Sequence, residues 1–306
     1  MQEENLKIVY PSRGSSFHFR LATKLHETLE NSGKSVDLMD SARVRDVYEK
    51  SLAESTLLIV NPWECAYEIG DRKRLFKRMR EAKRRIAVLA EAVEIEWFKR
   101  QFRLPLSYDA VIDIGFVSQQ EKLKSDFDVP YFFLYNAPTL EEKQALERGI
   151  NDERPIPWAF VGHFRQERAR LAAKLIQGLN PRGVVFLPKG GVVKEGQGTI
   201  GPLGLSALLS KTKFYVWSSH HEFPYYESLR FIEALTVGCV PCKVDAATAH
   251  LWRGAGIPGV FTSVEELGEA IKNKGFGVLL EEAREYYLSK GLLRDHLTEL
   301  FDSLGL

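Results

Sequence analysis

The chain is poor in the features that mark several common classes of protein. It has three cysteines in 306 residues, too few for a fold held together by disulfides. Its formal net charge is +1, so no overall field draws it to nucleic acid or to a membrane surface. No apolar run approaches the ~20 residues that a membrane-spanning helix requires. From these absences we expect a globular, cytoplasmic protein with reduced thiols.

Two phosphate-binding motifs are missing as well. No expected strand is followed by the Gly-x-Gly-x-x-Gly pattern of dinucleotide-binding enzymes, and no P-loop sequence occurs. These two absences disfavour a nicotinamide-dependent dehydrogenase and a kinase, and we expect no cofactor.

The chain does contain short β-rich runs that alternate with longer helical patterns, twice over. Such alternation predicts doubly wound parallel sheets, and therefore an α/β fold. We expect one domain over residues 1–140, a polar linker over 141–157 that ends in two prolines, and a second domain over 158–306 whose last helix can pack back on the first. Ligands bind beyond the carboxyl ends of such strands, so two facing sheets predict a site in a cleft.

The most informative stretch is SSHHEFPYYESLRFIEALTVGCVPC, residues 218–242. A helix is expected to begin near Tyr225. At ~100° per residue, Glu227, Arg230 and Glu233 share one polar flank. A helix N-terminus suits a phosphate, and a carboxylate one turn further on suits a pair of ribose hydroxyls. The alternative is an exposed flank of salt bridges.

The Cys-x-x-Cys pair of this stretch invites a redox or zinc interpretation. A redox pair is expected to open a helix, where the helix dipole lowers the thiol pKa. Cys239 and Cys242 instead follow a helix and enter a strand, and no second cysteine pair completes a zinc site. We predict two buried cysteines that act as small apolar side chains.

The same stretch resembles the donor-site signature of GT-B glycosyltransferases, Ser-x-x-Glu followed by Glu-Ala-x-x-x-Gly and a proline. The Arg-Phe-x-Glu-Ala-Leu form is most similar to the spore-maturation-type and exostosin-like families. The resemblance implies two Rossmann-like doubly wound domains that face a cleft. In that family the nucleotide sugar binds to the C-terminal domain and the acceptor to the N-terminal one. The family spaces its two glutamates eight residues apart, whereas Glu227 lies six residues and Glu222 eleven residues before Glu233. A ribose-binding role therefore carries over to Glu233 better than a sugar-binding role carries over to either of the others.

The resemblance extends over residues 160–244 and implies a set of donor-binding residues. They are Gly162, Arg165, Lys189, Ser219, Glu222, Glu227, Arg230 and Glu233. The implied co-substrate is a nucleoside diphosphate sugar, with a UDP-sugar favoured and a GDP-sugar as the alternative.

We expect no metal ion, because arginine, lysine and a helix N-terminus can neutralise the leaving diphosphate. The segment Asp126-Phe127-Asp128 resembles the metal-binding motif of the other glycosyltransferase fold, GT-A. It precedes a strand, whereas the motif in that fold follows one.

Two residues that follow strands of the first half are candidate catalytic bases. His18 follows the first strand and Glu64 the third, where the neighbouring Trp63 could stack on a sugar. Either side chain could deprotonate an acceptor hydroxyl. The alternatives are a histidine at a helix start and a loop with a packed tryptophan, neither with a catalytic role.

The segment 72–85 holds nine basic residues and an apolar face, which predicts an amphipathic helix with a basic exterior. A solvated face is one interpretation. The other is contact with an anionic acceptor, nucleic acid or the inner face of the membrane. The acceptor itself (saccharide, glycolipid, protein or nucleic acid) stays open.

From these patterns we expect a metal-independent glycosyltransferase of the hexosyltransferase type. The alternatives are a nucleotide-sugar epimerase on the same fold and a non-catalytic nucleotide-binding subunit.

Overall fold

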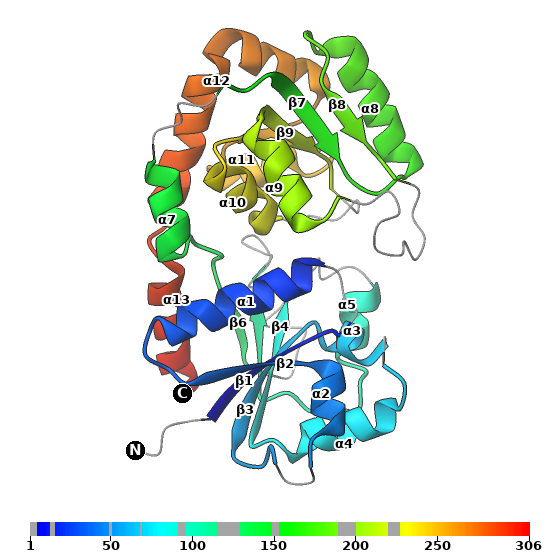
Figure 1. Ribbon diagram of the computed structural model, residues 1–306, viewed down its shortest axis with the longest axis vertical. Helices are drawn as coiled ribbons and strands as arrows, with labels where there is room; N and C mark the ends of the chain where they lie inside the picture. Colours follow the sequence, from blue (N-terminus) through cyan, green and yellow to red (C-terminus); the bar gives the residue numbers. More distant parts are fainter. Residues whose placement is uncertain are drawn as a thin grey trace. The chain divides into compact units, whose positions relative to one another are not determined.

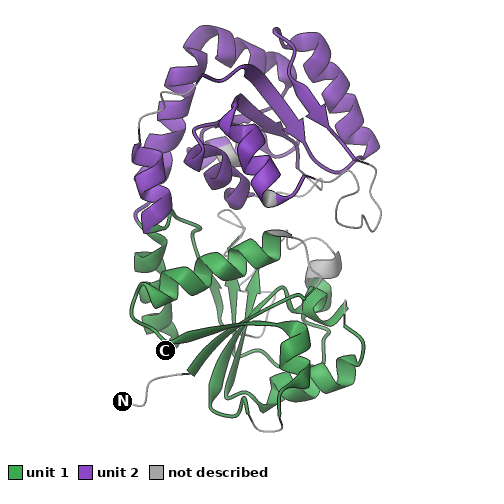
Figure 2. Cartoon of the chain, viewed as in Figure 1, with its two compact units in different colours: residues 1–139, 292–306 green, residues 140–291 purple. Residues whose placement is uncertain are grey.

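The computed structural model describes residues 5–12, 16–48, 51–67, 69–90, 96–114, 129–148, 153–188, 200–219 and 227–306. Lys189, Glu222 and the Asp126-Phe127-Asp128 segment lie outside the described residues. The chain forms two compact units (Figure 2). Unit 1 consists of Met1–Thr139 and Leu292–Leu306, and unit 2 of Leu140–Gly291.

Unit 1 is built on a six-stranded parallel sheet in the order β2-β1-β3-β4-β5-β6 (Figure 1). The β-rich runs of this half of the chain form its strands: β1 Asn5–Tyr10, β2 Val36–Asp40, β3 Ser55–Val60, β4 Arg84–Leu89, β5 Ala110–Asp113 and β6 Tyr131–Phe133. Most of their residues are apolar and buried, as expected for strands that are covered on both faces.

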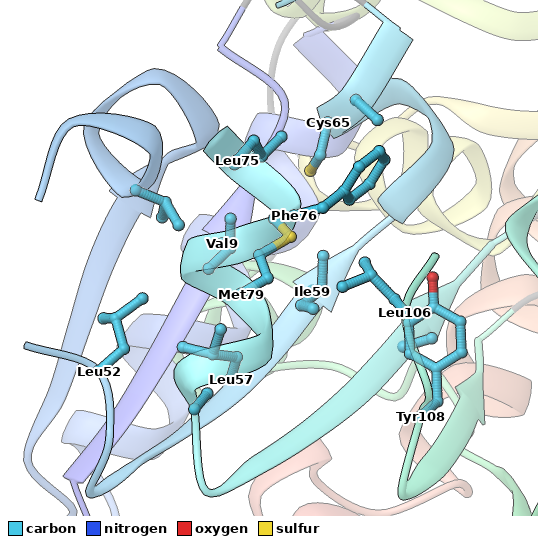
Figure 3. Packing of buried hydrophobic residues seen from close by; sticks show 14 of the residues in the cluster. Val9, Leu52, Leu57, Ile59, Cys65, Leu75, Phe76, Met79, Leu106 and Tyr108 are labelled. Carbon is cyan, nitrogen blue, oxygen red and sulfur yellow. The ribbon is translucent and has the colours of Figure 1, made fainter. Parts of the chain in front are cut away.

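Helices cover this sheet on both faces. A buried cluster joins α2 (Ser41–Asp46), α3 (Pro62–Tyr67) and α4 (Arg72–Glu81) to one face of the sheet. Figure 3 shows part of this cluster, in which Leu75, Phe76 and Met79 of α4 gather with Leu57 and Ile59 of β3. Helix α1 (Ser16–Glu30) packs against β1 and β3, and α13 (Leu293–Leu304) packs against α1. The short α5 (Glu96–Gln101) follows β4 and contacts α3.

The strand order places a topological switch point between β1 and β3. The chain runs from β1 outward to β2 and then returns past β1 to β3. At such a point the loops that leave the two central strands diverge, and the crevice between them is the usual ligand site of a doubly wound sheet.

Unit 2 repeats the plan with a five-stranded parallel sheet in the order β11-β10-β9-β7-β8. Its strands are β7 Ile156–Val161, β8 Val184–Phe186, β9 Thr212–Trp217, β10 Val240–Val244 and β11 Val260–Phe261. Its switch point therefore lies between β7 and β9. The helices are α7 Leu140–Glu147, α8 Gln166–Gly178, α9 Pro202–Ser210, α10 Ser228–Thr236, α11 Ala249–Gly254 and α12 Val264–Leu288. Two parallel sheets with helices between their strands confirm the predicted Rossmann-like α/β fold.

Two predicted segments have different boundaries in the structure. The basic helix expected over 72–85 ends at Glu81, and Arg84 and Arg85 belong to β4. They are fixed there because Arg84 donates to the carbonyls of Leu304 and Gly305, while Arg85 donates to that of Ser107.

The stretch 141–157, expected as a linker, holds most of α7 and the start of β7 and lies in unit 2. Leu146 of α7 is buried, and α7 packs against α10 and α12. Arg154, in the same stretch, is buried and donates to the carbonyls of Leu209, Thr212 and Val237.

None of the helices in the described ranges combines the length and the hydropathy that crossing a membrane requires.

Candidate functional site

Basic side chains gather at the switch point of unit 2, where β7 ends and α8 begins. Arg165 is the N-cap residue of α8, and its side chain makes no capping hydrogen bond to that helix. Arg168, in the first turn, is buried and donates to the carbonyl of His163 (3.3 Å). A Cβ on Gly162 would lie 3.1 Å from a guanidinium nitrogen of Arg168, so the glycine makes room for this side chain.

The position of Arg168 carries an electrostatic cost. Burial lowers the pKa of Arg168 from its ordinary value, and the positive charges of Arg230 and Arg165 lower it further, while Glu227 opposes them. An arginine remains charged at physiological pH all the same. The guanidinium groups of Arg165 and Arg230 therefore both lie within electrostatic range of that of Arg168 at the carboxyl end of the sheet. This arrangement suits an anion of more than one charge.

Glu227 is the side chain that holds Arg230 in this arrangement. Its carboxylate is buried, accepts a hydrogen bond from the indole nitrogen of Trp217 (2.8 Å) and lies 3.0 Å from Nε of Arg230. Arg230 also donates to the hydroxyl of Tyr215 (2.8 Å). The structure separates the three residues of the predicted polar flank by exposure. Glu227 is buried, whereas Arg230 is half-buried. Glu233 is also half-buried and lies one turn further along α10.

A second polar cluster follows β9 and β10. Asp245 accepts hydrogen bonds from the hydroxyls of Ser219 and Thr248, both at 2.6 Å, and lies 3.6 Å from Nζ of Lys243. Burial acts to raise the pKa of Asp245, but Lys243 and the two hydroxyls outweigh it, so the net pKa is lowered. Ser219, a predicted donor-binding residue, is thereby tied to the end of the neighbouring strand.

The two cysteines of the Cys-x-x-Cys pair are free thiols with 0% exposure. Burial raises the pKa of both, which keeps them protonated and unreactive. The prediction that they are buried, small apolar side chains is confirmed.

In unit 1 the structure brings the two candidate bases together at the switch point between β1 and β3. Nδ1 of His18, in the first turn of α1, lies 2.9 Å from Oε2 of Glu64 on α3. The amide nitrogen of Asn61, the residue directly after β3, lies 3.0 Å from Nε2 of His18. Gln101, at the end of α5, donates to Oδ1 of Asn61 and accepts from the backbone N–H of Trp63. The two candidates are therefore members of one hydrogen-bonded chain.

An aromatic surface flanks Glu64 on α3. The ring of Trp63 stacks on that of Tyr67, with centroids 6.1 Å apart and an interplanar angle of 27°. The guanidinium of Arg100 lies 5.4 Å from the centroid of the Trp63 ring, within cation–π range. Tyr67 is 62% exposed, and the guanidinium of Arg72 lies 5.5 Å from the centroid of its ring. Aromatic rings and two guanidinium groups thus lie together on the helix that carries the Glu64 carboxylate.

Several of these residues were not predicted from the sequence. Arg168 follows Arg165 by three residues in the same first helical turn, a spacing that could have identified it. Asn61 could have been singled out as the first residue after a predicted strand. Gln101 and Asp245 carry no comparable signal, because their roles arise from partners on other elements.

Comparison with known protein families and with curated proteins yields no match for this chain. Solved structures do match. A DNA-modifying β-glucosyltransferase, crystallised with and without its substrate uridine diphosphoglucose, aligns with a TM-score of 0.61 at 12% identity over 99% of this chain and 100% of its own. An α1,3-fucosyltransferase aligns with a TM-score of 0.44 at 13% identity over 96% of this chain and 81% of its own. The full-length match to the first of these, together with the two parallel sheets, shows that the chain has the fold of the GT-B glycosyltransferases.

Proposed function

We propose that the protein is a glycosyltransferase that moves a hexose from a nucleoside diphosphate sugar to an acceptor hydroxyl. The proposal gives the donor to unit 2 and the acceptor to unit 1. The observation that carries it is the group of arginines at the switch point of unit 2, formed by Arg165, Arg168 and Arg230.

Charge is the first argument for a diphosphate at this point. Burial of Arg168 and repulsion from Arg230 and Arg165 disfavour its positive charge, and Glu227 opposes them. An anion that binds among the arginines relieves this cost. Helix α8, 13 residues long, begins at the same place with its N-cap side chain making no capping bond. The N–H groups of its first turn and its dipole add to the attraction for phosphate.

The same charges supply the chemistry of the leaving group. Negative charge grows on the diphosphate as its bond to the sugar breaks, so fixed cations stabilise the transition state more than the ground state. This is the reason for proposing a transfer that needs no metal ion. Arginine is well suited to the task, because its planar fork matches phosphate oxygens in pairs.

The nucleoside is proposed to lie beside α10. Glu233 is partly exposed there, one turn beyond Arg230, and a carboxylate can accept both hydroxyls of a ribose. A uridine nucleotide is favoured, since the β-glucosyltransferase of the same fold uses uridine diphosphoglucose.

The acceptor is proposed to bind at the aromatic face of α3. Trp63 and the exposed Tyr67 supply aromatic surface for contact with a sugar, and Glu64 lies on the same short helix. The exposed basic side chains of α4 (Arg72, Lys73, Arg74, Lys77 and Arg80) would favour an acceptor that carries negative charge.

The test compares two arginines of the same helix. Arg168→Ala removes the central guanidinium, whereas Arg170→Ala removes an exposed one two residues along, on another side of α8. UDP affinity is measured by calorimetry for the wild type and both variants, with UMP as the ligand that lacks the outer phosphate. We expect Arg168→Ala to weaken UDP binding at least ~10-fold, as the loss of a charge-assisted hydrogen bond of about 1.5–3 kcal/mol implies. UMP binding should change less, and Arg170→Ala should match the wild type.

Two results would contradict the proposal. A wild type that binds neither UDP nor GDP has no donor site in unit 2. An Arg168→Ala variant with unchanged UDP affinity would move the site away from the arginine group.

A further inference from the structure

The chain of hydrogen bonds around His18 fixes which ring nitrogen carries the proton. It starts at the backbone N–H of Trp63, which can only donate, so the group of Gln101 that faces it must be the amide oxygen. The amide nitrogen of Gln101 then faces Asn61, whose oxygen accepts. The Asn61 amide nitrogen in turn faces Nε2 of His18, which must accept with its lone pair.

One tautomer of neutral His18 satisfies this order. With Nε2 accepting, the proton sits on Nδ1, which lies 2.9 Å from Oε2 of Glu64 and donates to it. A doubly protonated ring would turn an N–H toward the NH₂ group of Asn61, two donors facing each other. The arrangement therefore opposes the use of His18 as a proton acceptor, because its only lone pair is already occupied.

Exposure separates the two side chains further. The side chain of His18 is 5% exposed and that of Glu64 is 21% exposed. Asn61 and Gln101, which complete the chain of hydrogen bonds, are buried. The carboxylate is thus the member that solvent, and hence an acceptor molecule, can reach, and the imidazole lies behind it.

We propose, resting on the function proposed above, that Glu64 is the general base of an inverting transfer and that His18 is a positioning residue. In this step the acceptor hydroxyl gives its proton to Oε1 of Glu64 while its oxygen bonds to the anomeric carbon. The bond from that carbon to the diphosphate breaks, and the nucleoside diphosphate leaves with the electron pair. His18, fixed by Asn61 and Gln101, holds Oε2 and so aims Oε1.

The kinetic test uses UDP-glucose with water as the acceptor and measures the release of UDP. Glu64→Gln should lower kcat at least ~100-fold, as expected when a general base is lost. His18→Asn places an amide nitrogen where Nδ1 lies and keeps a donor to Glu64, so it should stay within about 10-fold of the wild type. His18→Leu removes the donor and should lose about 100-fold, since a misplaced group can cost that much. Glu54→Gln, an exposed glutamate of the same unit, is the control. UDP affinity should be the same in all of them.

A spectroscopic test needs no activity. In protein labelled with ¹⁵N-histidine, the His18 ring, assigned by its loss in His18→Asn, should show a protonated Nδ1 and an unprotonated Nε2. Gln101→Met breaks the chain of hydrogen bonds while keeping the bulk of the side chain, and both tautomers of His18 should then appear.

Each outcome bears on the proposal. A His18→Asn variant as impaired as His18→Leu, or a Glu64→Gln variant with normal turnover and intact UDP binding, would overturn the division of roles and leave the transferase function standing. A wild type that binds neither UDP nor UDP-glucose removes the function, and the base role with it. A protonated Nε2 in the wild type would refute the proposed order of hydrogen bonds around His18, whatever the activity.

Discussion

Asp245, at the end of β10, is bound by Ser219, Thr248 and Lys243. Its negative charge contributes to the stability of unit 2. Its net pKa is lowered in the folded protein, so the unfolded chain binds the proton more readily. The stabilisation is therefore complete above the ordinary aspartate range near ~3.9 and is lost as the pH falls through the folded-state pKa. Lys243 is fully buried beside it, which makes a loss of the negative charge costly.

Asp245→Asn should accordingly lower the free energy of unfolding by about 2 kcal/mol at pH 7. The difference from the wild type should begin to shrink as the pH falls below ~3.9, where the unfolded aspartate takes up a proton. It should vanish below the lowered folded-state pKa, because both proteins are then neutral at this position in either state. Urea unfolding at a series of pH values measures it, with Asp302→Asn as the exposed control. A difference that stays constant with pH would mean that the ionised carboxylate is not the source.

At the scale of single residues, the sequence predicted candidates better than it predicted their partners. His18, Glu64 and Arg165 could be proposed because each follows a strand, where sites in parallel sheets lie. Their partners depend on contacts across the fold. Gln101 donates a hydrogen bond to Asn61, which lies 40 residues earlier in the sequence. Ser219 donates one to Asp245, which lies 26 residues later. No local sequence pattern encodes contacts between residues so far apart in the sequence, because such contacts follow from strand order and helix placement together.

The connection from α11 to β11 shows how an element can depend on one glycine. Gly256 and Gly259 share a φ of +71°, in the left-handed region that costs a residue with a Cβ about 1–2 kcal/mol. A Cβ on Gly259 would also lie 2.2 Å from the carbonyl oxygen of Pro241, whereas one on Gly256 meets nothing within 4 Å. The carbonyl of Gly259 also accepts a hydrogen bond from the backbone N–H of Lys243 on β10 (2.7 Å).

Gly256→Ala should therefore cost about 1 kcal/mol of unfolding free energy, and Gly259→Ala about 3 kcal/mol or more, since overpacking adds to the backbone term. The two variants differ in the clash alone, so each serves as the control for the other in urea unfolding. Equal losses would show that the loop moves to accept the extra methyl group.

The elements themselves followed from periodicity where the pattern was strong. Buried strands such as β3 and β9 each end in a run of four apolar residues, so they could be predicted with little context. The end of α4 could not, because Lys83, Arg84 and Arg85 continue a basic run that suits a helix surface as well as a strand. What decides the boundary is tertiary: the backbone of β4 pairs with β3, and Arg84 bonds to the end of α13.

At the scale of the whole molecule, the two units should respond separately to perturbation. Phe301 of α13 is 1% exposed and lies in unit 1, under Nζ of Lys34 at 5.5 Å from the ring centroid. Phe301→Ala should cost unit 1 about 3–5 kcal/mol. Amide hydrogen exchange should then quicken in β1, β3 and α1 and stay unchanged in β7, β9 and β10.

The reciprocal experiment adds UDP to Phe301→Ala. Amide hydrogen exchange should then become slower in unit 2, which is proposed to bind the nucleotide. Asp302→Ala, an exposed neighbour on α13, should leave the exchange of both units as it is. Faster exchange throughout the chain in Phe301→Ala would mean that the units unfold as one.

The order of the units along the chain has a consequence for biosynthesis. Unit 2 occupies residues 140–291, between the two parts of unit 1. A ribosome that adds ~5–20 residues per second needs about 10–30 s to go from residue 140 to the end of α13. Throughout that time the first 139 residues wait without the helix that covers α1, while unit 2 can finish folding. The nascent first unit is thus the part of the chain with the longest exposure to chaperones and proteases.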